Sequence, residues 1–161
     1  MPISPEAYHL NTFMQRIVDT AVEIFTEYGV DLPSKRYWTA GTAVIDCEQL
    51  VVSLVQLYLG APGDQADAPQ RLMVPRTAVC TLTIARNVPT IGQNGRSPDA
   101  AKIQEYAGNI AVDAWILVDT VSRFDQWEAG QFGVGVIATV DIAEPEGGLQ
   151  AVNMQLTMAV P

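Results

Sequence analysis

The feature that most constrains this chain is a one-sided apolar stripe along residues 10–28. Apolar side chains recur there at three- and four-residue spacing, with polar and charged side chains between them. An apolar stripe on one side of a helix has to be buried against another element. We therefore predict a surface helix that begins with Pro5 at its first position and ends at Gly29. Its predicted stripe is Leu10, Phe13, Met14, Ile17, Val18, Ala21, Val22, Phe25 and Tyr28.

Alternating segments predict the sheet on which such a helix packs. Residues 76–88, 134–142 and 151–160 each alternate apolar with polar or small side chains, as strands with one buried face do. A Glu-Pro-Glu-Gly-Gly turn separates the last two segments, which predicts an antiparallel hairpin. Residues 36–45 have the aromatic and β-branched composition of a further strand.

Two more segments carry helical signals. In residues 47–59, Asp46 and Gln49 resemble a capping box and apolar residues follow at helical spacing, so we expect a helix. The same run is rich in valine, which leaves a strand as the alternative. A third helix is expected from Ser97-Pro98 to about Phe124. Its predicted stripe is Ile103, Tyr106, Ala107, Ile110, Ala111, Ala114, Leu117, Val118 and Val121.

These elements predict an α+β fold. We expect a mostly antiparallel sheet of about four strands flanked by two to three helices, in the order α-β-α-β-α-β-β. The 161 residues are enough for one domain spanning 1–161. Residues 60–75 and 89–97 are rich in proline, glycine and polar side chains, so we expect them to form mobile loops.

Composition excludes several classes of function. The formal net charge is −9, which argues against a nucleic-acid reader because that role needs a basic surface. No run approaches the roughly 20 apolar residues of a membrane span, and the first ten residues do not resemble a signal peptide. We therefore expect folding in a reducing cytoplasm, with Cys47 and Cys80 as core thiols rather than a disulfide.

Charged residues make up 17% of the chain, against about 25% in an average soluble protein. Such a surface favours contacts with partners or with further copies. Among the tryptophans, Trp38 and Trp115 are predicted to lie in the core. Trp127 lies in a predicted connection, where we expect this chain or a neighbour to cover it.

Nucleophilic and cofactor sites lack essential parts. His9 is the only histidine, and we interpret it as a surface or helix-end residue. Asp46 and Glu48 flank Cys47 and favour its neutral thiol, which argues against a catalytic cysteine. Residues 133–138 match the letters of a dinucleotide-binding fingerprint, but a strand-like run follows them where the fingerprint needs a helix.

Metal, carboxylate and anion sites also lack essential residues. One histidine and two distant cysteines are too few for zinc, and Asp64 with Asp67 are too few for a calcium loop. The pairs Asp46–Glu48 and Glu144–Glu146 lie where caps and turns normally carry acids, and the loop 92–96 lacks the end of a phosphate-binding loop. The sequence therefore predicts no catalytic, cofactor-binding or metal-binding residue.

Three segments resemble a known family. Arg36-Tyr-Trp-Thr-Ala-Gly, Asp46-Cys-Glu-Gln-Leu and Leu57-Tyr-Leu-Gly-Ala-Pro-Gly, together with Pro75-Arg-Thr-Ala and the hairpin of residues 133–160, are similar to tail terminator proteins. These come from bacteriophages of actinobacteria with long non-contractile tails. The resemblance extends in order from about residue 10 onward.

The resemblance implies a structural virion protein. Members of that family form a ring, usually a hexamer, that caps the finished tail tube and joins it to the head-side connector or stopper. Its partners are then further copies, the major tail tube protein and the connector, with genomic DNA passing through an acidic lumen without specific binding. The resemblance also makes the loops 60–75 and 89–97 candidate contacts, and it carries over no individual interface residue. Another neck component, such as a head–tail adaptor or stopper, and a small metabolic enzyme are the alternatives.

Overall fold

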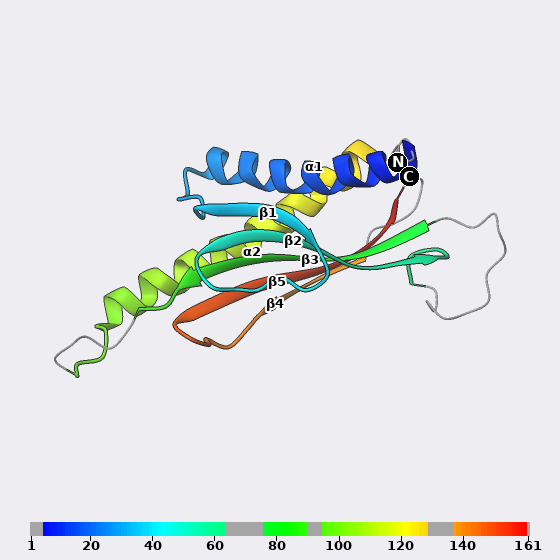
Figure 1. The fold of residues 1–161 in the computed structure, drawn as a ribbon. Helices are drawn as coiled ribbons and strands as arrows, with labels where there is room; N and C mark the ends of the chain where they lie inside the picture. Colours follow the sequence, from blue (N-terminus) through cyan, green and yellow to red (C-terminus); the bar gives the residue numbers. More distant parts are fainter. Residues whose placement is uncertain (1–4, 64–75, 90–94, 129–136, 161) are drawn as a thin grey trace.

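Two helices pack on one face of a five-stranded mixed sheet in the computed structural model (Figure 1). The structure describes residues 5–63, 76–89, 95–128 and 137–160. The elements follow the order α-β-β-β-α-β-β, so the predicted α+β class is right and the predicted order is wrong at its third element. The elements are α1 Pro5–Tyr28, β1 Lys35–Ala40, β2 Gln49–Leu59, β3 Arg76–Asn87, α2 Ala100–Glu128, β4 Ile137–Ile142 and β5 Leu149–Val160.

Helix α1 has the predicted bounds. At its C-terminus the N–H of Val30 donates to the carbonyl of Phe25 and the N–H of Gly29 to that of Thr26, which is a Schellman cap. Gly29 adopts a φ of +64°, which a side chain disfavours. The stripe is buried as predicted except at its two ends and at Val22, and it includes Ile24, which the prediction missed. Its buried members are Phe13, Met14, Ile17, Val18, Ala21, Ile24 and Phe25.

Residues 49–59 form strand β2, so the expected helix over 47–59 is wrong and the strand alternative is right. Leu50, Val51 and Val52 are all fully buried. Three consecutive buried side chains need cover on two faces, which a helix on the protein surface cannot provide but a central strand can. The resemblance of Asp46 to a helix cap was therefore misleading. Its carboxylate instead accepts a hydrogen bond from Lys35 at 3.2 Å.

The strands lie in the spatial order β1-β2-β3-β5-β4. Strand β1 is parallel to β2, whereas β2–β3, β3–β5 and β5–β4 are antiparallel. The sheet is therefore mostly antiparallel, as predicted, but contains one more strand than expected. Strands β4 and β5 form the predicted hairpin, and β3 ends one residue earlier than predicted. An irregularity in β2 between Leu54 and Gln56 leaves Val55 unpaired and half exposed.

The main core lies between the helices and one face of the sheet. Leu82 of β3 pairs with Met154 of β5, and both side chains are buried on this face together with Cys80. Trp38 packs against the edge of the core without being fully buried, so its predicted core position is right only in part.

The other face of the sheet is partly covered by residues 41–48, which connect β1 to β2 (Figure 1). Gly41 ends β1 with a φ of +82°, so the strand predicted to reach Ile45 ends five residues earlier, at Ala40. The Gln49 amide donates to the carbonyl of Val44 at 3.0 Å and fixes this connection. Small side chains on this face, among them Ser53 and Ala85, let the connection lie close to the strands.

Helix α2 begins as predicted near Ser97-Pro98, because Asp99 accepts a hydrogen bond from the N–H of Lys102 and caps the helix. Its first nine residues, 100–108, are mostly exposed, and this end extends beyond the sheet (Figure 1). The predicted stripe is wrong at several positions, since Ile103 and Val118 are exposed while Asp113 is fully buried. Neither helix in the described part of the chain carries an apolar stretch of the length that a membrane crossing requires.

Candidate protein–protein interface

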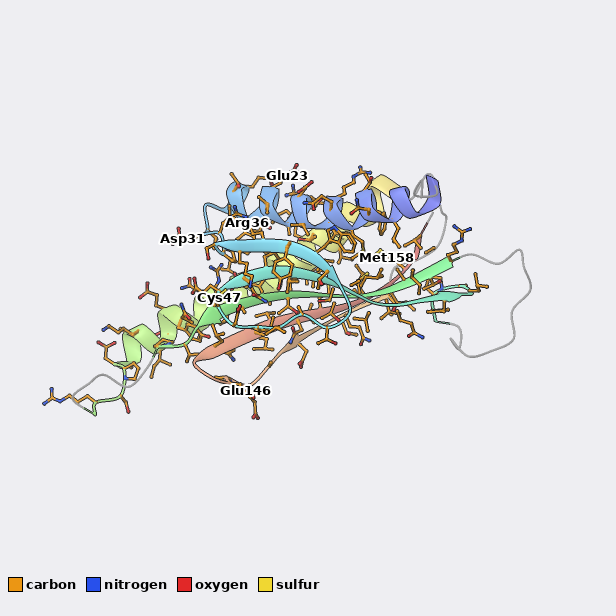
Figure 2. All side chains as sticks on the ribbon, in the orientation of Figure 1. Glu23, Asp31, Arg36, Cys47, Glu146 and Met158 are labelled. Carbon is orange, nitrogen blue, oxygen red and sulfur yellow. The ribbon has the colours of Figure 1, made fainter. Side chains whose placement is uncertain are left out.

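Cys47, the cysteine considered as a nucleophile, lies in the connection before β2 and is labelled in Figure 2. Cys47 is half-buried and does not begin a helix. A hydrogen bond with Asp46, followed by burial, raises the pKa of its thiol, as the flanking acids led us to expect. Cys47 is not a core residue, which corrects the prediction made for it. Cys80 is, and burial raises the pKa of its thiol to about 12. Both thiols are free.

Three of the four acids in the predicted pairs line one open hollow of about 480 Å³. Asp46 lines it from the β1–β2 connection, and Glu144 and Glu146 line it from the β4–β5 turn. Asp46 is paired with Lys35, while Glu48 lies apart from the hollow and accepts the backbone N–H of Asn87 at 3.1 Å. These contacts give Asp46 and Glu48 structural partners. Within the described ranges, no three histidine, cysteine or acidic side chains gather as metal ligands do.

A buried ion pair links β3 to α2, and sequence reasoning missed it. The Nε and Nη2 atoms of Arg86 each donate to a carboxylate oxygen of Asp113 at 2.9 Å. Asp113 is fully buried and the Arg86 side chain is 12% exposed. The guanidinium also lies 5.5 Å from the centroid of the Phe25 ring on α1. Two signals were available in the sequence. Asp113 is a charged residue inside an apolar stripe, and Arg86 is a charged residue at the end of an apolar strand.

Beside this pair lies a polar hollow of about 450 Å³, lined by the acidic side chains of Asp31, Glu48 and Glu105 and by Tyr106. The hydroxyl of Tyr106 is buried without a hydrogen-bond partner among the described residues. Burial, followed by the charges of Asp113 and Glu48, raises the pKa of Tyr106. The Tyr106 side chain as a whole is only partly buried. We interpret the Arg86–Asp113 ion pair as the contact that holds the two helices and β3 together.

Among the described helix side chains, the most exposed large apolar one lies on α2. Trp115 is 61% exposed, which contradicts its predicted core position. Together with Tyr28, Val30, Ala111 and Val112, it lines a shallow depression of about 490 Å³. We call these five residues the helix surface. Exposed indole of this kind is a frequent anchor of protein–protein contacts.

The wall of the helix surface is held in place by charges. The hydroxyl of Tyr28 donates to Asp119 at 3.2 Å, and Arg123 contacts both Asp119 and Glu27. This network joins the ends of α1 and α2 and fixes the Tyr28 ring beside Trp115. The hydrogen bond with Arg123, opposed by slight desolvation, lowers the pKa of Glu27.

The second exposed surface is the edge strand β4. All six of its residues are exposed, with Ile137 at 50% and Ile142 at 51%. Exposed edge strands usually carry lysine, proline or a bulge that prevents further pairing, and β4 has none of these. Its one charged residue is Asp141. Such an edge favours pairing with another strand.

Several predicted features lie outside the described residues. These are most of the dinucleotide-like run 133–138, the pair Asp64 and Asp67, most of the loops 60–75 and 89–97, and the side chains of His9 and Trp127. Of the run 133–138, Ile137 and Ala138 belong to β4, as the strand-like pattern predicted.

Comparison of the sequence with protein-family models and with curated proteins gives no significant match. The features of the chain that bear on its function are the helix surface, the β4 edge and the sequence segments that resemble tail terminator proteins.

Proposed function

We propose that this chain is a structural subunit that assembles with copies of itself into a closed ring, and that the ring is a phage tail terminator. In this role it caps the tail tube, ends tube polymerisation and joins the tail to the head-side connector. The observation that carries the proposal is the location of the exposed apolar side chains. Two groups of them lie on different surfaces: Tyr28, Val112 and Trp115 on the helix surface, and Ile137, Val140 and Ile142 on the β4 edge.

Apolar side chains that are exposed in the single chain suit a ring for a geometric reason. A ring forms when one side of each subunit contacts a different side of the next and the rotation between them closes, so each subunit has neighbours on two sides. A two-fold dimer instead uses the same surface twice. Large exposed apolar areas are uncommon on soluble monomers, and burying one tryptophan or isoleucine contributes about 1.5–3 kcal/mol. The chain therefore has a reason to associate through both surfaces.

The long axis of the molecule also supports the proposal. The N-terminal end of α2 extends from one end of the sheet, and the paired ends of β2 and β3 extend from the other (Figure 1). A terminator needs two such ends, because the tube protein binds one side of the ring and the connector binds the other. The net charge of −9 is compatible with a lumen that DNA passes without binding.

Light scattering of the purified protein, with negative-stain images of the same sample, tests the ring. We expect rings of about six subunits, formed in solution or on added tail tubes. A monomer that stays monomeric with tail tubes present contradicts the proposal. Tails isolated before heads attach separate a terminator from a head–tail adaptor: a terminator is present on such tails, whereas an adaptor is absent from them.

A matched pair of substitutions tests whether the helix surface matters. Trp115→Ser removes the exposed indole, and we expect weaker ring formation or weaker tail joining with no loss of folding. Val44→Ser removes an apolar side chain that is 76% exposed on the β1–β2 connection, which lies on the opposite face of the sheet from the helix surface (Figure 1). Equal behaviour of the two variants in assembly and tail joining shows that the helix surface is not a contact.

A further inference from the structure

We propose that neighbouring subunits join by pairing β4 of one copy with β1 of the next, so that the sheet continues through the assembly. This inference rests on the proposed ring. The two strands are the outermost strands at opposite edges of the sheet. Arg36 on β1 and Glu146 at the turn after β4 mark these two edges in Figure 2.

The topology fixes the direction of the new pair. Strand β1 is parallel to β2, and the three antiparallel pairings that follow make β4 antiparallel to β1. When copies are arranged in a ring with the same orientation, β4 of one copy therefore meets β1 of the next in antiparallel pairing. Each strand has six residues, so neither leaves a long unpaired end.

The pattern of side chains limits the register. Directly opposed residues in a sheet share a face. The ladder places Lys35, Tyr37 and Thr39 of β1 on the face remote from the helices. It places Ile137, Thr139 and Asp141 of β4 on the same face, because they pair with odd-numbered residues of β5.

Charge selects one register among those that match the faces. It places Lys35 opposite Asp141, Tyr37 opposite Thr139 and Thr39 opposite Ile137. On the helix side it places Trp38 opposite Ala138, where a small side chain leaves room for a large one. Lys35 and Asp141 are both exposed. On the face remote from the helices, Lys35 is the charged residue of β1, at its start, and Asp141 is the charged residue of β4, near its end.

The same arrangement covers apolar side chains of α2. Ala107, Ala111 and Val118 are exposed and recur at four- and seven-residue spacing, so they share one side of the helix. That side is distinct from the one through which Asp119 and Arg123 contact α1. In a continued sheet the next copy's α1, which packs on β1 and β2, comes alongside the α2 that packs on β4 and β5.

Disulfide trapping tests the pairing directly. In a Cys47→Ser background, Tyr37→Cys with Thr139→Cys places two thiols opposite each other across the new contact. Within one copy, four strand spacings of about 4.8 Å separate them, so any disulfide between them has to join two copies. Ala40→Cys with Val140→Cys is the control, because the register separates these residues by about four positions, or roughly 13 Å, and Lys35 and Asp141 stay in place.

For the first pair we expect a ladder of disulfide-linked oligomers on a non-reducing gel, up to the size of the ring. For the control we expect no such ladder. Rings in the microscope without this ladder overturn the edge pairing and leave the ring function standing. A ladder of open chains without rings supports the edge pairing and contradicts the ring function. Monomers without cross-links, with tail tubes present, overturn both. Cross-linked dimers from Thr139→Cys alone overturn the proposal by showing that β4 pairs with itself.

A charge exchange tests the register independently. Asp141→Lys puts two like charges opposite each other, and we expect association at each contact to weaken about two- to fivefold. Asp141→Lys leaves the internal contact between Lys35 and Asp46 intact, so its effect reports on the neighbour alone. Adding Lys35→Glu together with Asp46→Lys, which keeps opposite charges at positions 35 and 46, should restore association. No effect of Asp141→Lys, or no recovery in the triple variant, contradicts the proposed register.

Discussion

Replacing Asp113 with alanine is the sharpest test of how this fold is held together. The carboxylate of Asp113 is fully buried and accepts both hydrogen bonds from Arg86 at 2.9 Å. Without it, a guanidinium whose side chain is 12% exposed loses its counter-ion. Removing one partner of a buried ion pair costs about 3–5 kcal/mol. Since small domains are stable by about 5–15 kcal/mol, the variant should lose about a fifth of its stability or more.

Urea unfolding followed by circular dichroism measures this loss. With an m-value near 2 kcal/mol/M, Asp113→Ala should lower the midpoint by about 2 M. Asp119→Ala is the matched control, because it removes a partly exposed acid from an (i, i+4) pair with Arg123 and should cost less than about 1 kcal/mol.

The double variant Arg86→Met with Asp113→Leu removes both charges. It should recover most of the stability, because no charge is then left buried without a partner. Asp113→Ala losing no more than Asp119→Ala would refute the reasoning.

Further expectations concern the backbone and the thiols. Gly29→Ala should lower the free energy of unfolding by about 1–2 kcal/mol because Gly29 has a φ of +64°. Gly108→Ala should raise it by up to about 1 kcal/mol, because Gly108 lies inside α2 with open space around it. Urea titration compares the two variants, and equal effects contradict the role of Gly29 in ending α1. Native protein should expose one slowly reacting thiol to Ellman's reagent, and Cys80, with a pKa of about 12, should react only on unfolding. Because the pKa of Cys47 is raised, less thiolate is present at any given pH, so its rate should rise at higher pH than that of free cysteine, and Asp46→Asn should shift that rise to lower pH; an unchanged pH profile argues against the Asp46 contact.

Local signals were sufficient for α1 and for the β4–β5 hairpin. Helix α1 has a start signal at Pro5, a glycine at its end and one apolar stripe between them, and each signal acts within a few residues. The hairpin combines alternation with a turn, and the structure places the two strands side by side as expected. In both cases the signals that specify the element lie close together in the sequence, although packing on the rest of the chain stabilises it.

Strand β2 was mispredicted because its environment is not local. Its first residues are buried by the helices on one face and by the connection 41–48 on the other, and this second cover has no pattern of its own in the sequence. Apolar residues that are buried on both faces fit a helical spacing as well as a strand. The Arg86–Asp113 pair was missed for the same reason, since it joins residues 27 positions apart.

The remaining mispredictions have a different physical origin. Ile103, Ala111 and Val118 were predicted to be buried on α2 and Trp115 was predicted to lie in the core, yet all four are exposed in the single chain. Their pattern is that of buried residues, and local and global preferences in a folded protein normally agree. A partner that covers Ile103, Ala111 and Val118 of α2 together with the edge of β4 removes the disagreement at these three positions. The proposed pairing of β4 with β1 would place such a partner there, so the burial that the sequence predicts for them is the burial expected in the proposed ring.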